Sequence, residues 1–111
     1  MKKADLFAEL IATYSNHGWQ LKTVLMQPQT RSEIIAEEDE LLNSVKVEDA
    51  SIDALWFSRP SHNNREAWEL RLLAETQYAL FENFEADETE EQREEARREM
   101  EARLRDYLSH G

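Results

Sequence analysis

The sequence contains no cysteine and only two glycines, and each scarcity excludes a class of functional site. Without cysteine there is no disulfide framework, no thiolate zinc site and no cysteine nucleophile. Gly18 and Gly111 are too few and too far apart for the GxGxxG and Walker loops that cradle phosphates, or for the GxSxG turn of serine hydrolases. The chain therefore lacks the commonest nucleotide-binding and hydrolase motifs.

Histidine is also scarce: His17, His62 and His110 stand alone, and no HxH or HExxH pattern includes them. A zinc site needs three or four ligands at defined spacings, so we expect no metal. The acidic run at 37–40 lacks the alternating oxygen ligands and central glycine of a calcium loop. No nucleophile stands with a base and an orienting group. We expect a protein that is not an enzyme and has no cofactor.

Basic residues are outnumbered, with 13 Lys and Arg against 24 Asp and Glu, giving a net charge of −11. Such a chain repels polyphosphates and has no basic stripe with interleaved aromatics, so we expect no nucleic-acid partner. No apolar run approaches 18 residues, and Asp5 and Glu9 interrupt the N-terminal one. We therefore expect no membrane partner and a cytoplasmic location.

The 111 residues are 41% hydrophobic, enough for a single small globular domain over residues 1–111. Residues 3–17 have the apolar spacing of a helix, which Gly18 ends. Residues 19–27 alternate like a strand, which Pro28 ends. The strand pattern places three side chains on one face: Trp19, Leu21 and Leu25.

The segment 30–50 is predicted to be irregular with a short helical piece. Its apolar residues suit a helix, whereas its acidic run suits a solvated loop. Towards the C-terminus, residues 89–92 (TEEQ) have the form of a capping box and begin a long charged helix. Glu94 and Arg98 are four residues apart, as in pairs that stabilise helix surfaces.

The stretch LWFSRPSHNNREAWEL, residues 55–70, predicts a hairpin. If residues 60–64 form its loop, Trp56 faces Trp68, and Asp53 faces Arg71. A second loop at 74–76 adds another strand and completes a three-stranded antiparallel meander. Both registers place even-numbered residues on one apolar face: Ile52, Ala54, Trp56, Trp68, Leu70, Leu72, Tyr78, Leu80 and Phe84. A helix over parts of 65–84, capped by Asn63, is the alternative.

The predicted fold class is therefore α+β. It has an N-terminal helix, a strand, the irregular segment, the meander and a long charged C-terminal helix, with both long helices on one face of a small sheet. The opposite face carries Leu55, Phe57, Leu73 and Phe81 among polar residues. Exposed apolar patches mark interaction surfaces. We predict a non-enzymatic interaction or adaptor module with the capacity to self-associate through these residues, unless segment 30–50 covers them.

The hairpin tip offers a second hypothesis. Arg59, His62 and Arg65 would form a positive island there, which suits a small anionic ligand such as a carboxylate or phosphate. The plain alternative is that the neighbouring Pro, Ser and Asn residues form a turn and the charges are solvated.

Overall fold

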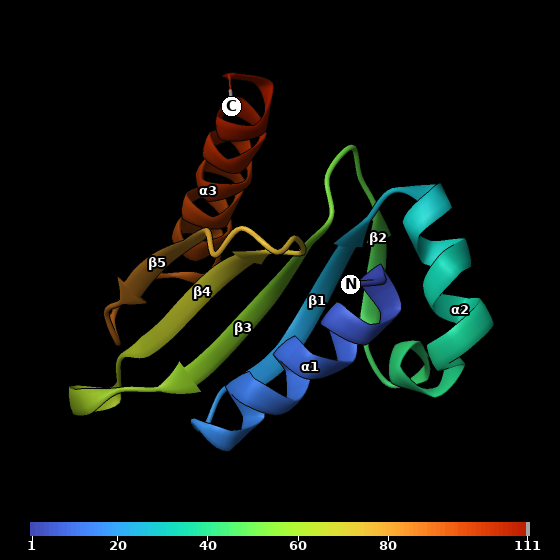
Figure 1. Cartoon of the computed structure of the whole chain (residues 1–111). Coiled ribbons are helices and arrows are strands. Elements are labelled where there is room, and N and C mark those ends of the chain that lie inside the picture. Colours follow the sequence, from blue (N-terminus) through green and yellow to red (C-terminus); the bar gives the residue numbers. More distant parts are fainter. Residues whose placement is uncertain (111) are drawn as a thin grey trace.

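The computed structural model describes residues 1–110, apart from the side chains at positions 38, 39 and 41 (Figure 1). Within that range the chain is α+β, as the sequence predicts. The helices are α1 (Lys3–Asn16), α2 (Pro28–Asn43) and α3 (Glu90–His110). The strands are β1 (Gln20–Met26), β2 (Lys46–Asp49), β3 (Ala54–Pro60), β4 (Glu66–Leu72) and β5 (Ala79–Phe84).

The five strands form one sheet in the order β2-β1-β3-β4-β5, in which β1 and β2 are parallel and the other neighbours antiparallel. The helix α2 connects the parallel pair. The prediction that residues 30–50 are mostly irregular is therefore wrong. Ile34 and Leu42 are buried, while Glu33, Glu37 and Glu40 are exposed. The acidic residues are thus the solvent face of a helix and not a loop.

The sheet is covered on both faces, so the expectation that both long helices share one face is wrong. Helices α1 and α2 pack on one face, through a cluster that includes Phe7, Ile34 and Phe57. Helix α3 packs on the other, where Met100 and Leu104 join Leu70 and its neighbours. Figure 1 shows α1 crossing in front of the sheet. The two layers of helices agree with the sequence of β3, whose consecutive residues from Ala54 to Ser58 are all buried. A strand that is buried on both faces needs a layer of structure on each side.

The meander of β3, β4 and β5 is confirmed, and its even-numbered residues share the α3 face. In β4 and β5, Leu70 lies opposite Leu80, as predicted. Between β3 and β4 the predicted register is wrong by two residues, because Trp56 lies opposite Leu70 and not Trp68. A slip of two residues keeps the same side chains on each face. The two tryptophan rings still meet diagonally, 5.9 Å apart and edge to face.

The loop between β3 and β4 explains the shift in register. It spans residues 61–65, closed by a hydrogen bond from the Ser61 N–H to the Arg65 carbonyl. Asn63 and Asn64 both adopt positive φ, at 58° and 61°. Asparagine tolerates this left-handed conformation better than most residues, which places the turn one residue later than expected.

A bulge in β1 changes which residues share a face. The pairing with β3 shifts between Leu21 and Thr23. Trp19 and Leu21 therefore pack with the α1 cluster, while Leu25 packs on the α3 side. The expectation that these three share one face is wrong, because a bulge adds one residue and reverses the alternation beyond it.

The predicted ends of the long helices are confirmed. Gly18 follows α1 with φ of 84°, the left-handed conformation that ends helices. At the start of α3, Thr89 and Gln92 exchange backbone and side-chain hydrogen bonds as a capping box. Tyr107 and Leu108 near the end of α3 are exposed.

Candidate functional site

The hairpin tip does not bring its three basic residues to one point. The Arg59 Nη1 donates to the backbone carbonyl of His17 at 2.8 Å, whereas the Arg65 Nε donates to Glu85 at 2.7 Å. His62 is exposed between them. Both guanidinium groups thus have partners within the chain. Anion binding by Arg59, His62 and Arg65 stays a prediction that this arrangement does not favour.

Three of the four residues expected to form an interaction surface belong to the core. Leu55, Phe57 and Leu73 are each at most 1% exposed. Helix α1 covers them, with the Tyr14 ring stacked on Phe57 at 4.0 Å between centroids. The prediction that these three are exposed is wrong, because α1 lies on this face and not beside α3. Phe81 differs from them: its residue is 53% exposed.

An aromatic surface remains on this side of the sheet, formed by Tyr14, Trp19, Arg59 and Phe81. Trp19 contacts Phe81 edge to face, with ring centroids 6.4 Å apart, and contacts Tyr14 in the same way at 6.1 Å. The Arg59 guanidinium lies 4.4 Å from the Trp19 ring centroid. Figure 1 shows why the surface is open, since α1 lies over β1 and leaves β4 and β5 uncovered on this side.

The residues of the aromatic surface are held in place by neighbouring groups. Tyr14 donates a hydrogen bond to the Glu69 carboxylate on β4. Burial, together with this bond, raises the pKa of Tyr14 well above its ordinary value, so its hydroxyl remains a donor. A hollow of about 490 Å³ adjoins the surface at the hairpin tip. Its lining includes Arg59, His62, Phe81 and Asn83.

Sequence reasoning found Phe81 and Arg59 but assigned them to different sites, and it placed Trp19 only on one face of the first strand, with no part in a site. Phe81 lies on β5, Arg59 on β3 and Trp19 directly before β1, and they meet only because of the strand order. Their contact therefore carries no signal in the spacing of the sequence.

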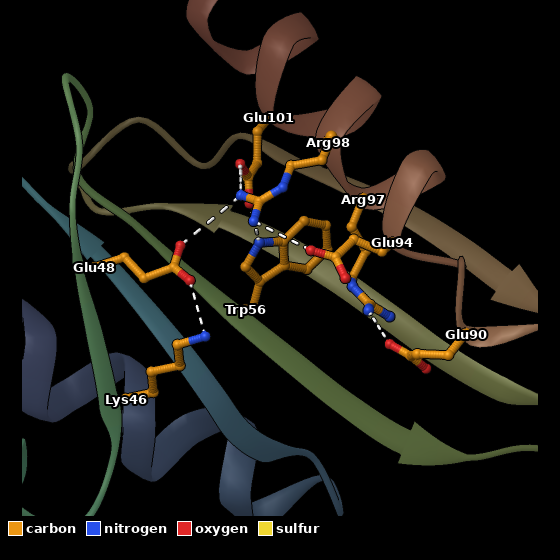
Figure 2. A network of polar contacts seen from close by, with 8 residues as sticks. All are labelled: Lys46, Glu48, Trp56, Glu90, Glu94, Arg97, Arg98 and Glu101. Atoms are coloured by element: carbon orange, nitrogen blue, oxygen red, sulfur yellow. Dashed lines mark hydrogen bonds and ion pairs between the residues drawn. The ribbon is translucent and has the colours of Figure 1, made fainter. Parts of the chain in front are cut away.

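A second hollow, of about 230 Å³, lies between α3 and the sheet. Figure 2 shows its polar side chains converging on Trp56. The Trp56 Nε1 donates to the buried Glu101 carboxylate at 2.8 Å. Arg98 donates to Glu101 and to Glu94, both at 3.2 Å. The nearby Glu101 charge is the main cause that raises the pKa of Arg98, which keeps its guanidinium charged.

The remaining charges in this hollow are paired as well (Figure 2). Glu48 on β2 lies 3.1 Å from Lys46 and 3.9 Å from Arg98. Arg97 bonds to Glu90 at 2.5 Å and covers the Trp68 ring, 4.6 Å from its centroid. Each charged group drawn has an opposite partner within the chain. The network therefore attaches α3 to the sheet.

Among residues 1–110, leaving aside the side chains at positions 38, 39 and 41, no three metal-ligating side chains gather closely enough to hold a metal ion. None of the helices in that range has a stretch both long and apolar enough to cross a membrane. No protein-family model, curated protein or solved structure matches this chain.

Proposed function

We propose that this protein is a non-enzymatic interaction module that binds a partner protein through its aromatic surface. The observation that carries the proposal is Phe81, a large apolar side chain more than half exposed beside Trp19 and Arg59. Exposed aromatic residues next to arginine are the composition typical of the energetic centres of protein interfaces.

The rigidity of the surface supports the same proposal. Arg59 is bonded to the His17 carbonyl and lies over Trp19, so little side-chain freedom is left to lose on binding. Tyr14 is likewise fixed by Glu69. Preordered contact residues bind more tightly than mobile ones because association costs less entropy.

The charge of the chain favours a different protein over a second copy as the partner. Each copy has a net charge of −11, so two copies repel one another at long range. Self-association was expected through a broad apolar face, but three of its four residues are buried by α1. A partner of opposite charge meets no such repulsion.

A selection from a displayed library of random peptides tests the proposed function. We expect enriched peptides that shift the NMR resonances of Trp19, Arg59 and Phe81 when added to the labelled protein. Failure to enrich any binder, or binders whose shifts lie on α2 around Ile35, would contradict the proposal. Ile35 is a useful reference because it is 44% exposed on a different element.

A further inference from the structure

The outer edge of β5 is an unpaired strand edge next to the aromatic surface. We infer that this edge binds an extended, basic segment of the partner protein, which adds to the sheet as a sixth strand; the inference rests on the proposed interaction function. The five strands end with β5 in the sheet order, and no strand of residues 1–110 lies beyond it. Figure 1 shows β5 at the outer border of the sheet.

The register of β4 and β5 tells which backbone groups face outward. The Leu72 N–H donates to the Tyr78 carbonyl at 3.0 Å, so this pair is hydrogen-bonded. Bonded and non-bonded pairs alternate along an antiparallel ladder, and therefore the even-numbered residues of β5 bond to β4. Three residues direct their N–H and carbonyl groups away from β4: Ala79, Phe81 and Asn83.

These outward groups have the spacing that an added strand needs. An extended segment running beside β5 meets a donor and an acceptor at every second residue. Its side chains alternate between the two faces of the sheet. Those on the face of Phe81 lie next to the aromatic surface, and those on the other face lie next to Glu82.

The charge around β5 defines the chemistry of the segment. Residues 73–92 include seven carboxylates and no lysine or arginine: Glu75, Glu82, Glu85, Asp87, Glu88, Glu90 and Glu91. Three of them already pair with cations from other parts of the chain, Glu75 with the N-terminus, Glu85 with Arg65 and Glu90 with Arg97, so the other four carry the attraction. Glu82 is exposed on β5, and none of the ion pairs formed by the described side chains includes it. A segment that alternates apolar residues with lysine or arginine places an apolar side chain beside Phe81 and a cation beside Glu82.

The same carboxylates disfavour a second copy at this edge. Two β5 strands side by side bring their acidic flanks together, and like charges on neighbouring strands are destabilising. Charged residues are one of the devices by which proteins protect an open edge, whereas β5 has no proline, lysine or recorded bulge to protect it otherwise. The edge of β5 is therefore protected by negative charge alone. This charge repels other copies of the chain but does not repel a basic segment.

The test uses the synthetic peptide acetyl-(Lys-Val)4-amide on the full chain, with acetyl-(Glu-Val)4-amide as its control. We expect the basic peptide to slow the hydrogen exchange of the Ala79, Phe81 and Asn83 amides by about tenfold or more, because exchange slows when an amide becomes hydrogen-bonded. The acidic peptide should leave these rates unchanged. Equal protection by both peptides, or by neither, would overturn the inference.

A proline variant separates strand addition from binding to the aromatic surface. Asn83→Pro removes one outward donor and keeps the Phe81 side chain, and an edge strand tolerates proline where its N–H faces solvent. We expect about tenfold weaker binding of the basic peptide, with Asn83→Ala close to the wild type. Undiminished binding by a folded Asn83→Pro protein would overturn the inference.

These experiments distinguish a failure of strand addition from a failure of the proposed interaction function. Library-selected peptides that need Phe81 but leave the β5 amides unprotected refute strand addition alone. Failure of the selection refutes the proposed function itself. If the hydrogen exchange of the β5 amides slows when the concentration of the free protein is raised, a second copy binds at this edge. That result would refute the inference that a basic segment binds there.

Discussion

Asp53 is a buried carboxylate, 3% exposed, that joins the starts of two helices to the sheet. It accepts hydrogen bonds from the Lys3 Nζ at 2.6 Å, the Thr30 hydroxyl at 2.7 Å and the Gln27 backbone N–H at 2.9 Å. Lys3 begins α1, and Gln27 directly precedes α2. Three separate segments, the start of α1, residues 27–30 and the residue before β3, are therefore joined by one side chain.

Replacing Asp53 by alanine should lower the free energy of unfolding by about 2 to 4 kcal/mol, because several donors lose their partner in a buried place. Chemical denaturation measures the change. Asp49→Ala is the matched control, since the Asp49 side chain is 75% exposed and its ion pair with Arg31 spans 3.6 Å. We expect the control to change the free energy by less than about 0.5 kcal/mol. Equal effects of the two substitutions would refute the role given to Asp53.

The same carboxylate gives a pH dependence of stability. Burial alone would raise the pKa of Asp53, but the bonds from Lys3, Gln27 and Thr30 outweigh it, so the pKa lies below its ordinary value of 3.8. The charged form is therefore favoured by folding. Its contribution to stability is present above about pH 4 and is lost as the pH falls through the folded-state pKa.

We predict that the difference in unfolding free energy between wild type and Asp53→Asn stays constant from about pH 7 to pH 5. It should shrink between about pH 4 and pH 2, where the wild-type carboxylate gains a proton and the amide does not. Denaturant titrations at each pH give this difference. A gap that widens on acidification would mean that the pKa of Asp53 is raised and not lowered.

Helix α3 is held by polar groups as much as by apolar ones. Met100 and Leu104 are buried, but Glu101 between them is buried too and bonds to Trp56 on β3. The helix is otherwise strongly charged, so its attachment depends on a few contacts near its middle. The exposed Tyr107 still stacks on Tyr78, with centroids 3.7 Å apart.

Glu101→Ala should destabilise the protein by about 1 to 3 kcal/mol, because the Trp56 Nε1 loses its acceptor in a buried place. Tryptophan fluorescence during denaturation measures both the loss and the changed surroundings of Trp56. Glu99→Ala, on the exposed side of α3, should have an effect below about 0.5 kcal/mol. If both variants unfold like the wild type, the polar network does not hold α3.

The elements that could be predicted from the sequence are those whose signals are local. The cap at Thr89, the end of α1 at Gly18 and the short loop before β5 each depend on neighbouring residues. The register between β3 and β4 could not be predicted, since a slip of two residues preserves the apolar pattern. There the left-handed Asn63 and Asn64 decide it.

The full length of helix α2, of which only a short helical piece was predicted, and strand β2 were missed for a different reason. Few of their side chains are buried, and Ile34 and Leu42 gain their burial in a tertiary cluster with α1 and the sheet. The local pattern is therefore weakly apolar, and tertiary contacts decide the structure. The candidate site was likewise decided by tertiary contacts, because Trp19, Arg59 and Phe81 are far apart in the sequence. Phe81 and Arg59 were both predicted to be exposed, but as parts of two different sites.

The whole molecule combines a sheet that has helices on both faces with an uncovered corner, made of the aromatic surface and the edge of β5. Elsewhere β3 and the α1 side of β1 are buried, and the charges under α3 are paired. The net charge of −11 keeps copies apart and attracts a basic partner. This corner is where we expect the protein to bind.

The affinity of a library-selected peptide for three proteins tests this account most directly. Calorimetric titration into the wild type, Phe81→Ser and Ile35→Ser compares two exposed apolar residues, 53% and 44% exposed, on different elements. We predict that Phe81→Ser weakens binding by about tenfold or more, equivalent to about 1.4 kcal/mol, while Ile35→Ser stays within about twofold. Unchanged affinity in Phe81→Ser would contradict the assignment of the binding surface.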